Sequence, residues 1–509
     1  MAVVLKKDKN SNKFEFSNII NFFKKPKPLL GFYLILLGIG FLYLCTAILF
    51  NDFTTPFGGD YCSQQFAFYT NGYDDWWHFF RTGEFVLYDT NTFLGANNIG
   101  SNSFYYLFDP FFMPILLFPR EFVPQGMAVL TIFKMATGGL AFYAFMRVIG
   151  TSKASSKIAA TAYAFSGWTA WYLWFNHFTE IIICLPLIFI GVEKVIKEKN
   201  PLILSASILL SGLTNFFFMF ALLVCGVIYA LFRYFQRIKT CKTKENLLIL
   251  AIGIAGFAIG LLMGAVVVLP STMVALESDR AVDSSYLDIL LTSISNGNIG
   301  KVFNMMFSWA NIDGNKEYRS LYPIIEFFYP VTSDRGTPLT KLGNETYDNV
   351  AGGLFCFTPM IILLTPALVR SFKEKKYSHF IAFGLFLISL FSPFVYYLFF
   401  GFTQAYSRWY LFVVASLIAY VGKYLDKFKE DSINLITIGG VIAILGEIIA
   451  ATLATIIINN YEKMTARVNI PLVLFLMVAY TSIVVIVLRI AIDRIHPRSI
   501  LKMITFTPH

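Results

Sequence analysis

Residues Leu29–Phe50 read LLGFYLILLGIGFLYLCTAILF, an apolar run without a charged side chain. A helix rises about 1.5 Å per residue, so about 20 apolar residues cross the hydrocarbon core of a bilayer. Runs of similar character recur along the chain, and none shows the strict alternation of a β-barrel strand. Since helices satisfy their own backbone hydrogen bonds in lipid, the run predicts an all-α polytopic membrane protein.

The composition supports this fold class. The chain has 509 residues, of which 56% are hydrophobic and only 14% charged, and its mean hydropathy is +0.63. A soluble domain carries about 25% charged residues. We expect about 12 transmembrane helices. They are residues 29–50, 122–146, 158–175, 181–196, 201–218, 219–235, 247–270, 351–369, 380–400, 409–421, 433–458 and 470–490. The 201–235 stretch must turn near Phe216–Phe220.

The net charge of +10 predicts topology and not nucleic-acid binding. Lys and Arg gather in short segments between apolar runs. These segments are Lys6–Lys27, Arg233–Lys244, Arg370–Lys376 and Lys423–Lys429. Such clustering is typical of cytoplasmic loops. We therefore expect a cytoplasmic N-terminal segment (1–28), a multi-span domain (29–490) and a cytoplasmic tail (491–509).

Two large loops then lie on the outer face, at about 51–121 and 271–350. The first begins with GGDYCSQQ, Gly58–Gln65, and mixes aromatic residues with carboxylates. Its carboxylates include Asp60, Asp74, Asp75, Glu84, Asp89 and Asp109. Carboxylates among aromatic residues at a membrane surface suit an enzyme that meets a lipid-borne, hydroxyl-rich substrate. The six cysteines form no disulfide framework and no metal-binding spacing.

Several short motifs in this order resemble the YfhO family of bacterial membrane proteins. The motifs are Gly59-Asp60 with Gln64 or Gln65, the Gly95-to-Gly100 turn, Tyr105-Tyr106 with Asp109-Pro110, Lys134 before Gly138-Gly139, Asn176-His177-Phe178 and Arg408-Trp409. The resemblance covers roughly residues 29–425. It implies a GT-C-like organisation, in which a polytopic enzyme takes a sugar from a polyprenyl-phosphate carrier on the outer face of the bacterial cell membrane.

The resemblance implies particular substrates as well. The first expectation for the donor is undecaprenyl phosphate-linked N-acetylglucosamine, and for the acceptor a cell-envelope polymer such as teichoic or lipoteichoic acid. Family members generally continue into a further extracytoplasmic C-terminal domain, whereas this chain ends at His509 after a basic tail. Acceptor recognition is therefore expected from the two large loops or from a partner, unless the chain is a shortened form of the family's proteins.

Asp60 is the candidate catalytic base. Inverting glycosyl transfer needs a carboxylate to take the acceptor's proton and positive charge to hold the departing phosphate. Asp60 would lie at the outer end of the first span, beside the lipid headgroups. The alternative is a loop aspartate that caps a turn after Gly58-Gly59.

Lys134 and Arg408 are the candidate phosphate ligands. A charge as deep in a span as Lys134 is costly and usually faces a cavity or a partner. The alternatives are a structural pair with an acid such as Glu447, or snorkelling to the interface. Arg408 offers a bidentate fork for phosphate, and its alternative is an interfacial anchor with Trp409.

Six further residues are candidates for substrate binding. They are Asp89, Asp109, His177, Glu180, Tyr105 and Tyr106. Asp109 precedes a proline and would alternatively begin a turn, and most interfacial aromatic residues are membrane anchors. No metal site is predicted, although a divalent cation remains open as a cofactor. The leading function is thus a glycosyltransferase. A flippase or transporter for a lipid-linked saccharide, or a non-catalytic envelope-assembly partner, are the alternatives.

Overall fold

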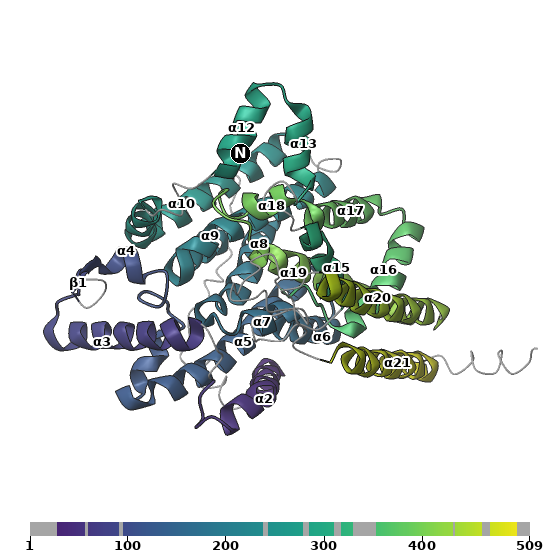
Figure 1. Cartoon of the computed structure of the whole chain (residues 1–509), viewed down its shortest axis with the longest axis horizontal. Coiled ribbons are helices and arrows are strands. Elements are labelled where there is room, and N and C mark those ends of the chain that lie inside the picture. The colour runs from purple at the N-terminus through teal and green to yellow at the C-terminus, as the bar shows by residue number, and fades with distance from the viewer. Residues whose placement is uncertain are drawn as a thin grey trace, which may run out of the picture.

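The computed structural model describes residues 28–55, 60–90, 95–237, 243–277, 285–309, 317–328, 353–430, 433–460 and 469–495. These residues form a bundle of helices with one two-residue β-ladder (Figure 1). Six of the described helices are long and apolar enough to cross a membrane. The chain is therefore an all-α, multi-pass membrane protein, and the full count of twelve spans stays a prediction.

The helices and strands have the following bounds. The long helices are α2 (Pro28–Leu49), α5 (Val123–Val148), α8 (Ile181–Glu198), α9 (Leu202–Arg237), α10 (Thr243–Leu276), α20 (Ile433–Asn460) and α21 (Ile470–Ile495). The shorter helices are α3 (Phe66–Thr82), α4 (Asn98–Asn102), α6 (Lys153–Ala164), α7 (Gly167–Tyr172), α12 (Ser285–Ser295), α13 (Ile299–Phe307), α15 (Tyr322–Phe328), α16 (Thr358–Lys373), α17 (Tyr377–Phe391), α18 (Pro393–Leu398) and α19 (Tyr410–Tyr424). The single π-helical turn of the described residues is η1 (Tyr61–Gln65). The short 3-10 helices are η2 (Met113–Leu117), η3 (Arg120–Phe122), η4 (Asn176–Phe178), η5 (Glu317–Leu321), η6 (Ser407–Trp409) and η7 (Leu425–Glu430), and the strands are β1 (Tyr88–Asp89) and β2 (Ala96–Asn97).

Helix α9 reverses direction at Asn215, so this one element contains two helices. Asn215 has extended backbone angles (φ −161°, ψ 97°), and its side chain accepts a hydrogen bond from the N–H of Phe218 at 3.1 Å. It therefore caps the second helix. Both halves pack along the same stretch of α8, since Leu204 lies against Gly191 and Gly226 against Ile188. The reversal lies one residue before the segment where the sequence requires a turn.

Helices α5 and α8 run parallel at the centre of the bundle. Gly138 of α5 makes this close approach possible, because a Cβ atom there would lie 2.5 Å from Cγ1 of Ile182. Further along both helices, Phe145 of α5 packs on Phe189 of α8, so the two helices run in the same direction. The large aromatic side chain of Trp168 is fully buried in the same hydrophobic core. The consequence is that the turn η4, which leads into α8, lies beside the middle of α5.

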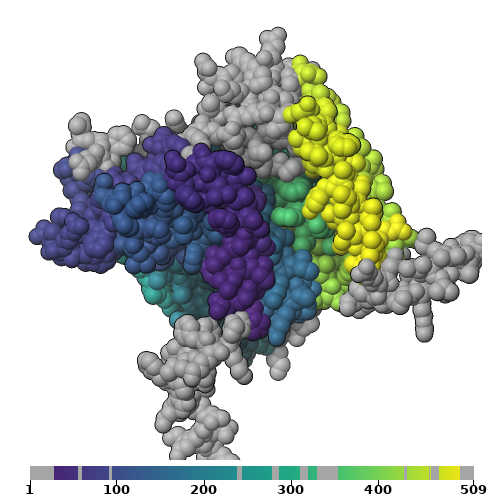
Figure 2. All heavy atoms as spheres, turned by 90° about the horizontal axis from the view of Figure 1, so that it is seen from below, coloured from purple at the N-terminus to yellow at the C-terminus, as the bar shows by residue number. Residues whose placement is uncertain are grey.

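The first large loop folds back over this turn. Its helix α3 is fixed at two points: the Tyr73 hydroxyl donates to the carbonyl of Phe118 at 2.9 Å, and the Trp76 indole donates to the carbonyl of Leu107 at 2.7 Å. In Figure 1 this loop region, with α3, α4 and β1, lies on the opposite side of the bundle from α20 and α21. Figure 2 shows α2 and α21 as separate ridges on another face. The described part of this loop therefore covers η4. We call its residues 60–90 and 95–121 the roof.

Three segments predicted to be cytoplasmic meet at one end of the bundle. Arg370 donates to the carbonyl of Lys427 at 3.2 Å, and Glu374 pairs with Lys427 at 2.8 Å. Burial lowers the pKa of Lys423, and the nearby charge of Arg233 lowers it further. The Arg233 segment therefore lies close to the Lys423 segment. Residues 1–27, 329–352 and 496–509, which hold the predicted N-terminal segment, part of the second loop and most of the tail, lie outside the described residues.

Candidate functional site

Lys134 is buried in the middle of α5, with 1% of its surface exposed. Its ammonium group forms an ion pair with Glu180 and donates hydrogen bonds to the Tyr69 hydroxyl at 3.1 Å and to Oδ1 of Asn176 at 3.0 Å. It also lies 5.6 Å from the ring centre of Tyr106. The partner is therefore Glu180 and not the suggested Glu447, which accepts a hydrogen bond from Thr481 instead.

The turn η4 supplies the groups that meet Lys134. The amide of Asn176 donates to Oγ1 of Thr131 at 2.6 Å, which joins the turn to α5 one helical turn before Lys134. Glu180 directly precedes the first residue of α8. A carboxylate at that position is favoured by the partial positive charge of the helix N-terminus. The turn η4 and the start of α8 therefore place the carboxylate of Glu180 and the amide oxygen of Asn176 next to the buried ammonium group of Lys134.

Asp109 lies in the same buried cluster, with 1% of its surface exposed. Its Oδ1 accepts a hydrogen bond from the N–H of Phe111 at 2.9 Å, so it also begins a turn, as the alternative reading proposed. Burial, and then the neighbouring charge of Glu180, raise the pKa of Asp109 well above its ordinary value. Two carboxyl groups, those of Asp109 and Glu180, therefore lie in the same buried cluster as the ammonium group of Lys134.

His177 connects the turn to the roof. Its Nδ1 lies 2.9 Å from Oε1 of Gln65, which also accepts a hydrogen bond from the Tyr106 hydroxyl. Because that oxygen only accepts, Nδ1 carries the proton. Burial, followed by the charges of Arg408 and Lys134, lowers the pKa of His177 well below its ordinary value. His177 is therefore neutral at pH 7, and its Nε2 is buried without a hydrogen-bond partner among the described residues.

Arg408 lies on the other side of η4 and is half-buried. Its guanidinium carbon is 3.9 Å from the ring centre of Tyr406 and 4.8 Å from that of Phe178. The backbone carbonyl of Arg408 accepts a hydrogen bond from the Trp168 indole at 2.9 Å. The rings of Tyr406 and Phe178 therefore orient the planar guanidinium group of Arg408.

Asp60 lies at the start of the roof and not in the buried cluster. It is half-buried and directly precedes η1, whose last residue, Gln65, contacts His177. Gly58-Gly59 lie outside the described residues. Tyr105, also half-buried, stacks on Phe68 with ring centres 3.8 Å apart. The structure therefore brings Asp109, Lys134, Glu180, His177 and Tyr106 together, with Arg408 and the η1 segment on either side.

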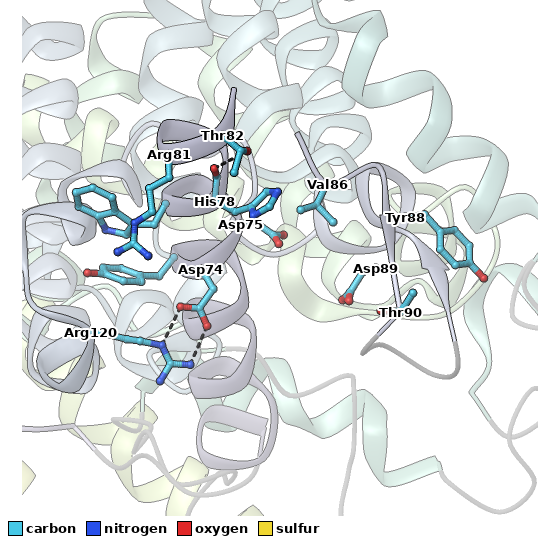
Figure 3. Close-up of a pocket in the computed structure, with 12 residues that line it drawn as sticks. Asp74, Asp75, His78, Arg81, Thr82, Val86, Tyr88, Asp89, Thr90 and Arg120 are labelled. Atoms are coloured by element: carbon cyan, nitrogen blue, oxygen red, sulfur yellow. Dashed lines mark hydrogen bonds and ion pairs between the residues drawn. The ribbon is translucent and has the colours of Figure 1, made fainter. Parts of the chain in front are cut away.

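Asp89 occupies a different place. It lines a pocket of about 650 Å³ between α3 and the segment before β2, together with Asp74, Asp75 and Arg120 (Figure 3). Among the described residues, no three His, Cys, Asp or Glu side chains converge in a metal-binding arrangement.

Sequence reasoning assigned no role to Tyr69, Asn176 or Gln65, all of which belong to the buried cluster. Asn176 and Gln65 stood within the motifs Asn176-His177-Phe178 and Gly59-Asp60 with Gln64 or Gln65, so a signal for them existed. Tyr69 carried none, because the chain has 27 tyrosines and nothing in the local sequence marks this one.

These features define a multi-pass helical membrane protein with a buried charge network beneath a folded loop. The family described as "Bacterial membrane protein YfhO" matches residues 31–306, more than half of the chain. The chain therefore belongs to the YfhO family, as its motifs predicted. All the candidate site residues except Arg408 lie in the matched region.

One relative supports the same membership. The chain is similar to "Uncharacterized protein YfhO" of Bacillus subtilis (strain 168), with 27% identity over 146 residues. The match covers 27% of this chain and 16% of the relative. No solved structure matches the chain.

Proposed function

We propose that the protein is a glycosyltransferase that moves a sugar from a polyprenyl-phosphate carrier to a polymer of the cell envelope. The observation that carries the proposal is that two charged groups are held next to η4. Asp60 directly precedes η1, which packs on this turn through Gln65, and Arg408 stacks on Phe178 of the same turn. A base and an anion-binding group are the two parts that inverting glycosyl transfer needs.

In the proposed reaction, the Asp60 carboxylate takes the proton of the acceptor hydroxyl. The acceptor oxygen then forms a bond to the anomeric carbon of the donor sugar from the face opposite the phosphate. The bond between that carbon and the phosphate oxygen breaks, and the carrier phosphate leaves with the electron pair. The Arg408 guanidinium stabilises the charge that develops on this phosphate. Inversion at the anomeric carbon follows from the single displacement.

The buried cluster has a supporting part in this proposal. Lys134 was expected to bind the donor phosphate directly, but its charge is already paired with Glu180. We therefore assign Lys134, Glu180 and Asp109 to the positioning of η4, and His177, Tyr105 and Tyr106 to the wall of the sugar site. The specific donor, undecaprenyl phosphate N-acetylglucosamine, and the acceptor, teichoic or lipoteichoic acid, rest on the resemblance to GT-C enzymes.

A flippase for a lipid-linked saccharide is the second candidate. The observation that favours it is the Lys134–Glu180 pair within the helical bundle, because ionisable residues inside membrane proteins often mark ion or proton pathways. The two functions differ in their need for a base at Asp60.

The glycan composition of the cell surface tests the proposal. A deletion strain should lose one sugar from an envelope polymer, and the intact gene should restore it. Asp60→Asn should accumulate in the membrane and fail to restore the sugar. Glu84→Gln, a change at an exposed carboxylate of the same loop, is the matched control and should restore it. Restoration by Asp60→Asn would contradict the enzyme proposal and favour the flippase.

A further inference from the structure

A polar pocket lies between the end of α3 and the strand β1, apart from the cluster around Lys134. Its volume is about 650 Å³. Figure 3 shows its two walls: Asp74 and Asp75 come from α3, and Asp89 comes from the facing segment. Arg120 reaches in from η3 and forms two hydrogen bonds with Asp74, at 2.8 and 2.7 Å.

The facing wall is held in place by the Asn- and Gly-rich turn. The amide of Asn98 donates to Oδ2 of Asp75 and to the carbonyl of Val86, both at 2.8 Å, and so joins the strand segment to α3. Gly95 has a φ of +120°, and a Cβ atom there would lie 2.0 Å from the Tyr88 hydroxyl. A glycine is therefore required for Tyr88 to lie against the turn. The pocket is formed before any ligand arrives.

The pocket walls combine hydrogen-bond acceptors with aromatic surface. Asp89 is only 9% exposed, and burial, with the charges of Asp89 and Asp74, raises the pKa of Asp75 above its ordinary value. Trp77 also lines the pocket, and its indole N–H is buried without a hydrogen-bond partner among the described residues. An indole N–H without a partner among the described residues therefore lies beside the pocket.

These groups select a class of ligand. Carboxylates accept hydrogen bonds from hydroxyl groups, and aromatic faces pack on the C–H faces of sugar rings. The lining holds three aspartates, two arginines and one histidine, so it offers no excess of positive charge to hold a phosphate. The described residues contain no metal-binding group of three ligands here. A neutral saccharide fits this chemistry best.

The position of the pocket relates it to the proposed reaction. At about 1.5 Å per residue, the helical path from Asp60 to Asp74 spans about 20 Å. A saccharide bound in the pocket is therefore too far away to be the unit that reacts at Asp60. A polymer, in contrast, can occupy both places at once.

We propose that the pocket between α3 and β1 binds a neutral, hydroxyl-rich saccharide carried by the acceptor polymer, such as a sugar already transferred to it, about 20 Å from the unit that receives the next sugar. The assignment to the acceptor rests on the proposed glycosyltransferase function. Saccharide binding itself does not, so the two can fail separately.

Direct binding tests the pocket. The probe is a tetramer of β-1,4-linked N-acetylglucosamine, titrated into the purified full-length protein and followed by calorimetry. Asp89→Asn and Tyr88→Ala should each weaken binding about tenfold or more, because one loses a charged acceptor and the other an aromatic face. Tyr88 is 61% exposed, so its removal should leave the fold intact. Glu84→Gln, outside the lining, should bind as the unchanged protein does.

The proposal would be overturned if the unchanged protein did not bind the tetramer, or if all the variants bound it equally. Tighter binding of a glycerol-phosphate oligomer than of the tetramer would also overturn it, since the ligand would then be an anion. If the tetramer binds as expected but the purified protein transfers no sugar, the pocket stands and the glycosyltransferase function fails.

Discussion

At the scale of single residues, the most informative contact is the buried pair of Lys134 and Glu180. Both side chains have 1% of their surface exposed, and two further polar groups, Tyr69 and Asn176, hydrogen-bond the ammonium group. A buried pair contributes modestly to net stability, because both charges lose their hydration. Removal of one partner is different, since it leaves an unpaired charge in an apolar surrounding.

We expect Glu180→Gln to destabilise the protein by about 3–5 kcal/mol. The double variant Lys134→Met/Glu180→Gln should regain most of that stability, because no charge remains buried. Thermal unfolding of the purified protein in detergent measures both. The control is Glu198→Gln, which removes one partner of the more exposed pair with Lys194 and should cost at most about 1 kcal/mol. An unfolding temperature for Glu180→Gln equal to that of the unchanged protein would refute a structural role for the pair.

At the scale of elements, the sequence predicted spans better than it predicted the folded loop. The uninterrupted apolar runs at α2 and α10 specify helices on composition alone. The turn within 201–235 was also predictable, and the structure adds that Asn215 caps the helix that follows it. The bounds of α3, Phe66–Thr82, could not be set by apolar runs, because this helix lies in the mixed polar and aromatic sequence of the first large loop.

The arrangement of the candidate site was only partly predictable. The motifs contained Lys134 and His177, and Glu180 followed in the same short turn, but a sequence cannot show that η4 lies beside the middle of α5. That position depends on the close packing of Gly138 against Ile182, a long-range contact. For the same reason the partner of Lys134 could not be chosen, and Asp89 could not be separated from Asp109.

At the scale of the whole molecule, the basic segments indicate which end of the helical bundle faces the cytoplasm. Lys427 contacts Glu374, and Lys157 lies over the ring of Phe32 at the start of α2. The start of α6, one turn before Lys157, is joined through Ser155 to Asp426 at 2.7 Å. The start of α2 therefore lies at the basic end, and clustering of positive charge favours the cytoplasmic side.

Cysteine labelling of intact cells tests this orientation. The exposed native Cys62 should react with a membrane-impermeant maleimide, because the loop that contains it is predicted to lie outside. In a Cys62→Ser/Cys241→Ser background, Lys373→Cys should react only after the membrane is permeabilised. Modification of Lys373→Cys in intact cells would reverse the assigned topology and place Asp60 on the wrong side for an outer-face enzyme.

The central claim, that the protein transfers a sugar with Asp60 as base, is tested most directly by transfer in a purified system. The measurement is the rate at which the purified protein moves radiolabelled sugar from undecaprenyl phosphate N-acetylglucosamine to lipoteichoic acid, alongside its affinity for that donor. Asp60→Asn should bind the donor normally and lose about 10²–10⁴-fold in rate, or roughly 3–5 kcal/mol of barrier. A transfer rate for Asp60→Asn within a few-fold of the unchanged protein, or no transfer by the unchanged protein, would contradict the claim.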